Sequence, residues 1–407
     1  MIKQHFEASA GYRKWTLGLL AVGGLILVLG FIFLGLSKDE HSQTRFWAVL
    51  LQNSTYFLLV VNASMFFICV TCLALGGWQM AFRRVPEAIS TLVPVFSGIA
   101  LVIFLYLIFG PNHHIYHWTD KGHIEHDSIL KGKSGFLNPW FFLIWSIVAM
   151  GMWSWAGAKM RQLSSEADER PMENDEAKNF HRRNTVWAAI FTVAFGLTVG
   201  STIPWFWLMS IDAHWYSTMY SWYTFASTFV SGMALIALFV VYLKNRDYLE
   251  WVNQEHLQDL GKFMFAFTIF WTYLWYSQFM LIWYANIPEE TIYFKVRMHG
   301  PYRAIFFLNL ILNFVLPFLL LMTRGSKRNY TVMTFLAILI VFGHWLDFYQ
   351  MVMPGALGEH YSLGWFEFGI LALYAGLIMH FVGKALAKKP LVSVNHPLLK
   401  ESIIHHA

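Results

Sequence analysis

The chain contains 407 residues, of which 57% are hydrophobic and 13% charged, and its formal net charge is +5. Because an ordinary soluble domain has roughly 25% charged residues, this composition excludes a water-soluble fold and requires much of the apolar surface to face lipid. The 2 cysteines exclude a disulfide framework, and the sequence lacks the CxxCH motif that attaches c-type haem. The basic residues lie between the apolar stretches, where they orient a membrane protein and do not indicate nucleic-acid binding.

Ten apolar stretches are long enough to cross a hydrocarbon core of roughly 30 Å, which takes about 20 residues. The first follows a leader of residues 1–15 and ends without a small-residue cleavage site, which predicts a retained span and not a removable signal peptide. We therefore expect a transmembrane domain over residues 16–385, followed by a cytoplasmic tail over 386–407. The predicted spans are 16–36, 55–76, 88–109, 138–158, 184–203, 222–243, 262–284, 303–322, 331–350 and 363–385.

The Lys and Arg residues alternate between rich and poor segments along the chain. Together with the basic residues at the adjoining span ends, the leader, the tail and the loops after even-numbered spans hold 21 of the 29, and the remaining loops hold 8. Because basic residues favour the cytoplasmic side, both termini are predicted to be cytoplasmic. The continuous apolar runs predict helices and not the alternating strands of a barrel. We expect an all-α integral membrane protein, with eight central helices in two four-helix bundles and the first and last helices packed outside.

An ionisable pair lies inside the ninth predicted span. His344 and Asp347 are three residues apart, so they share one face of the helix, and both fall in its outer half. An ionisable residue costs roughly 2.5–3.5 kcal/mol to insert, which makes it a functional candidate by default. The pair can accept, hold and pass a proton, because a carboxylate stabilises a neighbouring imidazolium. The alternative is a pair that only locks this span to a neighbouring helix.

Further polar residues are predicted near the same outer face. They come from the end of the seventh span, the start of the tenth span and the outer loops, and interfacial placement alone explains about half of them. A Trp-rich segment over 205–222 is expected to form a helix lying in the membrane interface. The polar residues are Asp212, His214, Gln278, Glu289, Glu290, Arg297, His299, Arg303, Glu359, His360 and Glu367.

Two stripes of hydroxyl and amide side chains follow helical spacing within the spans. The stripe on the sixth span comprises Thr224, Ser227, Thr228 and Ser231, and the stripe on the eighth comprises Asn309 and Asn313. Such stripes usually serve helix packing through interhelical hydrogen bonds, and this role is favoured. The alternative is that they hold waters that conduct protons.

Potential metal ligands give no strong motif. The His-rich loop at 113–126 fits no compact zinc pattern, so a solvated loop that contacts a partner is favoured over metal capture. Cys69 and Cys72 lie within an apolar helix and are predicted to be buried packing thiols. His344 and His380 fall at different depths, so they cannot share a haem iron, and the chain has no Cys₄ set. We therefore predict that this chain holds no redox metal.

Three segments resemble signatures of the ActF family, the membrane subunits of bacterial alternative complex III. The segment 207–218 is similar to the family pattern DW-M-S-L-(D/E)-P-H-W-(F/Y)-S-T, and 283–291 is similar to WYGNIPEET. The segment 344–347 with Met-Pro-Gly at 353–355 resembles the family's next-to-last span and its exit. Two positions depart from the first pattern: Phe206 stands where an acidic residue is expected, and Ala213 replaces the usual proline.

The resemblance implies a subunit of a quinol:cytochrome c oxidoreductase in the bacterial cytoplasmic membrane. Its implied partners are a quinol-binding subunit of the NrfD (polysulfide-reductase) type, an iron–sulfur subunit, c-type cytochromes and, in some assemblies, a terminal oxidase. Haem c and iron–sulfur clusters are expected in these partners, and this chain is expected to hold no cofactor of its own; whether a quinol site lies on this chain or only on its relative in the complex stays open.

Candidate roles follow from the outer polar set and the resemblance together. His344, Asp347, His214 and Glu290 are the predicted proton or quinol acceptors. Gln278, Glu289, Asp212, Glu367 and Arg303 are predicted to line the quinol site or the proton path.

Two other functions remain open on the sequence alone. The first is an autonomous secondary transporter, for which Pro94 and Pro317 would break the third and eighth spans; however, the ionisable residues are predicted to lie away from the midplane where transporters bind. The second is a membrane scaffold without chemistry.

Overall fold

The computed structural model describes residues 5–111, 114–360 and 363–406, and the regular structure in these ranges is helical. His113 of the His-rich loop and the first residues of the predicted leader lie outside the described residues. The long helices are α1 (Ala10–Gly30), α2 (Glu40–Leu73), α4 (Val93–Phe109), α7 (Pro139–Glu169), α8 (Asn174–Leu197), α10 (Met219–Lys244), α11 (Gln254–Ala285), α16 (Tyr330–Leu357) and α17 (Trp365–Lys388).

Shorter helices complete or connect these long ones. They are α3 (Arg84–Ser90), α5 (Lys121–His126), α6 (Ser128–Lys133), α9 (Ile203–Trp207), α12 (Pro288–Met298), α13 (Arg303–Leu310), α14 (Leu316–Leu321), α15 (Arg324–Arg328) and α18 (Leu399–Ile403). Three π-helical segments, Phe31–Gly35, Thr198–Thr202 and Ile311–Val315, continue longer helices without a break. The predicted all-α class is therefore confirmed.

Polar residues mark where several of the helices begin. The carboxylate of Asp39 accepts the first free backbone N–H groups of α2, and the side chains of Asn138, Asn253 and Asn329 do the same for α7, α11 and α16. These caps satisfy donors that have no partner within a helix. At its other end α11 stops at Asn286, which adopts the left-handed conformation that Asn tolerates.

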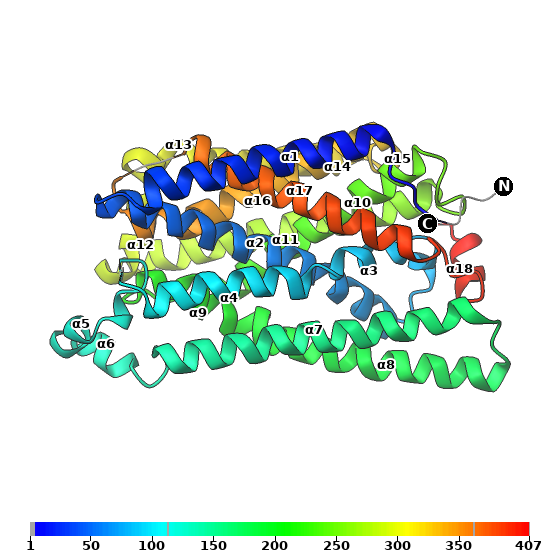
Figure 1. Ribbon diagram of the computed structural model, residues 1–407, viewed down its shortest axis with the longest axis horizontal. Helices are drawn as coiled ribbons and strands as arrows, with labels where there is room; N and C mark the ends of the chain where they lie inside the picture. The colour runs from blue at the N-terminus through cyan, green and yellow to red at the C-terminus, as the bar shows by residue number, and fades with distance from the viewer. Residues whose placement is uncertain (1–4, 112–113, 361–362, 407) are drawn as a thin grey trace.

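Nine helices in the described part of the chain are long and apolar enough to cross a membrane. They coincide with nine of the ten predicted spans. The remaining predicted span, 262–284, lies within α11, which is 32 residues long but less apolar, because it is rich in Trp, Tyr and Thr. α11 packs along α10, and Figure 1 shows it running in the same direction as the other long helices.

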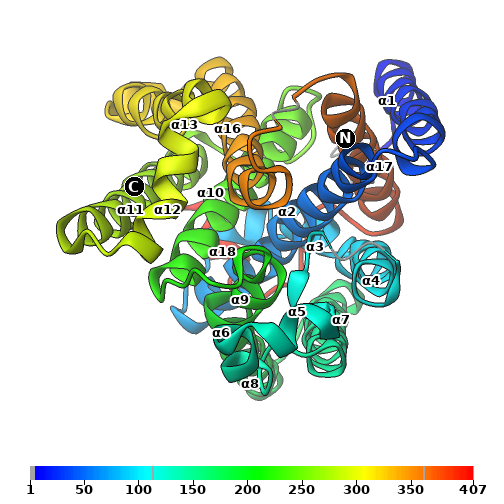
Figure 2. The ribbon, with the colours of Figure 1, turned by 90° about the vertical axis from the view of Figure 1, so that its left-hand side faces the viewer.

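The helices form two groups of four with a separate pair beside them. One group contains α2, α4, α7 and α8; the other contains α10, α11, α16 and the continuous helix built from α13, Ile311–Val315 and α14. α1 packs mainly against α17, outside both groups, as Figure 2 shows in an end view. This is the predicted arrangement of two bundles and two peripheral helices. α2 and α10 lie where the groups meet, and their apolar windows are 83% and 89% buried.

Both described chain ends lie at the same end of the bundle, close to α15 and α18 (Figure 1). This agrees with an even number of crossings. The helices α5, α6 and α12 lie at the opposite end, which the Lys and Arg distribution predicts to be the outer one. The tail does not extend freely: α18 packs against the 3₁₀ turn Trp78–Ala81, where the Ser402 hydroxyl lies 3.0 Å from the Ala81 nitrogen and accepts its hydrogen bond.

Several helices extend beyond the predicted spans, because buried charges find partners. α2 begins at Glu40 and not at 55, since Arg45 in its second turn donates two 2.8 Å hydrogen bonds to the buried carboxylate of Glu367. α16 continues through Pro354 to Leu357 and not to 350. The predicted interfacial helix over 205–222 was wrong: α9 ends at Trp207, a 3₁₀ turn follows, and α10 begins at Met219.

Candidate functional site

Asp347 is the best-connected polar residue in the interior. Its side chain is fully buried, and both carboxylate oxygens accept hydrogen bonds from neighbouring helices. Ser227 Oγ and Trp271 Nε1 donate to Oδ2 at 3.0 and 2.9 Å, while Asn309 Nδ2 donates to Oδ1 at 2.8 Å. The Tyr223 hydroxyl also donates to Oδ1. Three helices, α10, α11 and α13, therefore meet on one carboxylate of α16.

The donor set indicates the charge state that the site is built to hold. All four contacts are donors, which suits an ionised carboxylate, since a protonated one would also need an acceptor for its own proton. Hydrogen bonds to a charged group contribute about 1.5–3 kcal/mol each, so four of them can offset the cost of inserting a carboxylate among apolar helices. The contacts explain how Asp347 is tolerated at this depth.

His344 connects to Asp347 through Ser227. Its Nδ1 lies 2.9 Å from Ser227 Oγ and 3.8 Å from the nearer carboxylate oxygen of Asp347. Because the Ser227 hydroxyl donates to Asp347, its oxygen is free to accept the Nδ1–H bond of His344. The result is a continuous line, imidazole N–H to hydroxyl to carboxylate. Nε2, the other ring nitrogen, is buried and has no hydrogen-bond partner among the described residues.

A small cavity, lined by aromatic and polar side chains, adjoins the Asp347 side of this line. It has a volume of about 10 Å³, which is close to the space that one water needs. Its lining includes Tyr223 and Asn309 from the cluster, together with Gln278, Gln350 and Arg297. The side-chain oxygens of both glutamines are buried without hydrogen-bond partners among the described residues, so they are free to orient a water.

Arg297 of α12 forms the wall of the cavity that faces the predicted outer end. Its guanidinium donates to the backbone oxygens of Gln350 and Tyr293 at 2.9 and 2.8 Å, and its centre lies 3.4 Å from the centroid of the Tyr293 ring. Only 4% of the residue is exposed. A buried cation thus lines the same cavity as Tyr223 and Asn309, two of the donors to the buried carboxylate of Asp347.

The cluster continues on the other side of Asn309. The amide of Asn313 donates to Asn309 Oδ1 at 2.5 Å, so the two asparagines of the eighth span act in series. Gly343 of α16 permits this approach, because a Cβ at that position would collide with the Asn313 side chain. The stripes expected to serve packing therefore do join helices, and they also supply two of the Asp347 donors.

The structure brings three predicted site residues together. His344, Asp347 and Gln278 are all buried, the first two in the cluster and the third beside it. His344 is at the middle of α16, because the helix runs seven residues past the predicted end of 350.

The other predicted residues lie elsewhere. Glu367 is buried, but it pairs with Arg45. His214 is exposed, and its Nε2 lies 2.5 Å from Asp127 Oδ2. Glu289 and Glu290 occupy the first turn of α12, Arg303 is an exposed residue at the start of α13, and Asp212 is half-buried in the turn before His214. None of these is among the hydrogen-bond partners of Asp347 given by the described contacts.

Sequence reasoning missed Tyr223, Trp271 and Gln350. Tyr223 lies four residues before Ser227, so its helical spacing from the predicted stripe was a usable signal. Trp271 is one of 19 tryptophans, and its sequence position gives no sign that its indole N–H contacts a carboxylate.

Potential metal ligands do not assemble in the described part of the chain, where no three His, Cys, Asp or Glu side chains are grouped as a metal site requires. Cys69 and Cys72 are free and buried, as predicted for packing thiols.

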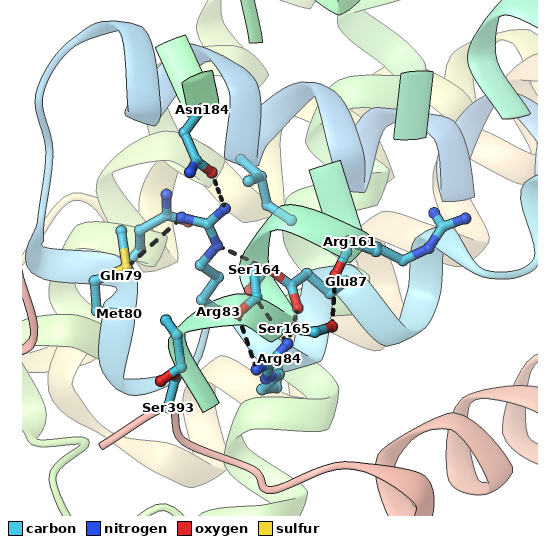
Figure 3. A network of polar contacts seen from close by, with 12 residues as sticks. Gln79, Met80, Arg83, Arg84, Glu87, Arg161, Ser164, Ser165, Asn184 and Ser393 are labelled. Atoms are coloured by element: carbon cyan, nitrogen blue, oxygen red, sulfur yellow. Dashed lines mark hydrogen bonds and ion pairs between the residues drawn. The ribbon is translucent and has the colours of Figure 1, made fainter. Parts of the chain in front are cut away.

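A second buried polar cluster surrounds α3 (Figure 3), which lies toward the end of the bundle that carries the termini (Figure 1). Glu87 of α3 pairs with Arg83 and Arg84 at 2.9 and 2.7 Å, and Arg84 also pairs with Asp168 of α7. Asn184 of α8 accepts a further bond from Arg83 at 3.4 Å. Two arginines and two carboxylates balance, so this cluster ties three helices together with no net charge.

The sequence matches no known protein-family model and no curated protein.

Proposed function

We propose that this chain is a proton-conducting membrane subunit of a quinol-oxidising electron-transfer complex of the alternative complex III type. The observation that carries the proposal is the buried line from His344 through Ser227 to Asp347, which ends beside a small cavity lined by two of the Asp347 donors, Tyr223 and Asn309. The family resemblance of the segments 207–218, 283–291 and 344–355 supports the choice of complex. In this proposal the redox cofactors belong to partner subunits: an NrfD-like quinol-binding subunit, an iron–sulfur subunit and c-type cytochromes in a bacterial cytoplasmic membrane.

The line supports proton transfer by exchange of hydrogen bonds. A proton that arrives at Nε2 of His344 makes the ring cationic, and the ring then releases the Nδ1 proton to Ser227 Oγ. Ser227 passes its own hydroxyl proton to Asp347 Oδ2 in the same step. The imidazolium and the carboxylate both become neutral, so charge moves without any side chain changing place. The Tyr223 hydroxyl then turns its own O–H toward the cavity that it lines with Arg297, accepts the carboxyl proton of Asp347 and releases its own proton to a water there.

The cavity favours protons over a quinol ring as its cargo. Pockets for organic ligands usually measure roughly 300–1,000 Å³, whereas the space beside Asp347 measures about 10 Å³. A water fits there and a quinol ring does not. We therefore place the quinol of the complex on a partner and assign the proton path to this chain.

The test uses the complete complex in liposomes, with quinol oxidation and proton release measured together. Asp347→Asn should lower proton release by about 100-fold or more, the usual contribution of a general acid or base. Asp212→Asn and His380→Gln are matched controls at exposed or half-exposed positions and should behave as the unaltered protein. A full proton yield per electron in Asp347→Asn would contradict the proposal.

One observation favours a second candidate, an autonomous proton-coupled transporter. The cluster lies at the middle of α16, and the neighbouring helix departs from regular α-helical geometry at the π-helical turn Ile311–Val315. Transporters place their sites near the midplane on interrupted helices. If the purified chain alone, in liposomes, moves a solute when a pH gradient is imposed, this function replaces the first.

A further inference from the structure

A basic pocket lies near the end of the bundle that carries the termini, away from the His344–Asp347 line. It has a volume of about 320 Å³ and is formed by α3, α7 and the C-terminal end of α17. Its lining includes five basic residues, Arg84, Arg161, Lys384, Lys388 and Lys389, and one acidic residue, Glu87. Neither the proton path nor the helix packing described above accounts for this concentration of positive charge.

Some of the basic residues of the pocket are paired with carboxylates, and the others form a surplus of positive charge. Glu87 is fully engaged by Arg83 and Arg84, and Asp168 engages Arg84 from the other side. This leaves Arg161 and the three lysines without a carboxylate of their own in the lining. The surplus is therefore four positive charges around one opening.

Arg161 is held in place by neutral groups. One terminal nitrogen donates to the hydroxyl and the backbone oxygen of Ser90, at 2.9 and 3.2 Å. In Figure 3 its guanidinium points away from the Arg84–Glu87 pair. Its position is thus determined by Ser90, while its charge stays available to an anion.

Arg84 supplies a second observation that points to a ligand. The residue is 5% exposed, yet its Nε atom is buried with no hydrogen-bond partner among the described residues. A buried guanidinium N–H normally has an acceptor, so an orphaned one in the wall of a pocket indicates a missing acceptor there. Lys389 responds to these positive surroundings: partial burial, and then the nearby Arg84, lower the pKa of its amino group.

The other wall of the pocket is apolar. Phe381, Ala385 and Leu386 of α17 line it together with Ala88 of α3 and Pro390. A pocket that is cationic on one side and apolar on the other, at the end of a transmembrane bundle, matches the boundary between phospholipid headgroups and acyl chains. The end that carries it is also the one richest in Lys and Arg, where anionic lipids are concentrated in a cytoplasmic leaflet.

We propose that this pocket binds the phosphate headgroup of an anionic phospholipid, with Arg161, Lys384, Lys388 and Lys389 around the phosphate oxygens and the apolar wall against the start of the acyl chains. A volume of about 320 Å³ exceeds the needs of a lone phosphate and suits a headgroup with glycerol or a second phosphate. Such a lipid would join α3, α7 and α17, which belong to different parts of the bundle.

The test measures lipid binding to the purified full-length protein. Phosphatidylglycerol, diphosphatidylglycerol and phosphatidylcholine are titrated in turn, with native mass spectrometry to count bound lipid and thermal unfolding to measure stabilisation. Inorganic phosphate at matched concentration forms a separate arm. Both anionic lipids should bind and raise Tm, and phosphatidylcholine and inorganic phosphate should not.

Variants assign the effect to the pocket. Because one basic residue contributes about 1 kcal/mol at an anionic surface, each of Lys384→Gln, Lys388→Gln and Lys389→Gln should weaken binding about fivefold, and the triple variant about 100-fold. The three lysines are exposed, so the fold should survive these changes. Arg13→Gln, Lys14→Gln and Lys178→Gln are the matched triple control, as exposed basic residues near the same end but outside the pocket.

Three outcomes would overturn the proposal. The first is an unchanged affinity for anionic lipid in the lysine triple variant. The second is an equal loss in the control triple, which would indicate attraction to the surface as a whole. The third is equal stabilisation by inorganic phosphate, which would assign the pocket to a soluble phosphate compound.

Discussion

The two buried polar clusters of this protein satisfy their charges in opposite ways. Around Glu87, two carboxylates meet two arginines, and every charge has a counter-charge. Around Asp347, one carboxylate meets four neutral donors, and His344, which can carry a positive charge, lies 3.8 Å away with a serine between them. A balanced cluster is locked, because any proton that enters or leaves unpairs a buried ion. A carboxylate that neutral dipoles hold can gain a proton without leaving an unpaired cation.

The largest expected effect on stability is therefore at Glu87. Glu87→Gln leaves Arg83 and Arg84 short of one negative charge in the interior, and breaking a buried pair in this way costs about 3–5 kcal/mol. Thermal unfolding in detergent should show the loss. Glu166→Gln is the matched control, because its pair with Arg183 is well exposed and should contribute about 0–1 kcal/mol.

The corresponding substitution of Asp347 by its amide should lower the free energy of unfolding by less than Glu87→Gln does. Asp347→Asn removes a charge without orphaning an opposite one, so only an acceptor is lost, at about 1–3 kcal/mol. If Asp347→Asn proved more destabilising than Glu87→Gln, the contrast between a structural and a functional cluster would fail.

Substitution of Ser227 tests whether this hydroxyl relays protons between His344 and Asp347 or only holds the helices together. Ser227→Ala removes the bridge between His344 and Asp347, and the lost hydrogen bond to a charged group should raise the barrier to proton transfer by about 1.5–3 kcal/mol, or roughly 10- to 100-fold in rate. Ser231→Ala is the control, since that hydroxyl donates to the backbone oxygen of Ser227, at 2.8 Å, and not to the line. Equal rates in the two variants would remove Ser227 from the path.

The smallest expected effect is on the stability of the loop around Asp127, which is hydrogen-bonded to His214, a predicted proton acceptor that lies outside the Asp347 cluster. The hydrogen bond from His214, and then the backbone N–H of Leu130, lower the pKa of Asp127 below its usual range. A carboxyl whose pKa is lowered in the folded state stabilises the loop above its ordinary pKa of about 3.9, and this contribution disappears as the pH falls through the lowered value.

Hydrogen exchange measures this effect locally. Exchange in the segment 127–133 should accelerate as the pH is lowered below about 4, once the intrinsic pH dependence is subtracted. Asp127→Asn should abolish this change, and Asp175→Asn, an exposed carboxylate on α8, should leave it intact. Loss of proton release in Asp127→Asn would show that His214 belongs to the path after all.

The sequence predicted the class, the two-bundle arrangement and the existence of the helices well, because the cost of inserting polar backbone and side chains into lipid acts on each segment separately. It predicted helix ends less well. Arg45 and Glu367 read as boundary charges, yet each is tolerated inside the bundle because the other neutralises it. Such pairing joins residues 322 positions apart and leaves no local pattern.

The residues of the candidate site differ in the same way: some could be predicted from a local pattern, and others depend on contacts between distant segments. His344 and Asp347 were found from the sequence, because an ionisable residue in an apolar span is anomalous wherever its neighbours lie. Gln278 joined them as expected, whereas His214, Glu290, Glu289, Asp212 and Arg303 were grouped by depth alone, and depth does not determine which residues meet.

What the sequence determined by itself is therefore the set of segments that must be helical and the span that carries the ionisable pair of His344 and Asp347. Only the tertiary structure decided that Tyr223, Ser227, Trp271 and Asn309 converge on Asp347, and that Arg161 and the lysines of α17 surround one pocket. The reason is physical: hydrophobic length and charge act along the chain, whereas hydrogen bonds and ion pairs between helices depend on how the helices rotate and pack.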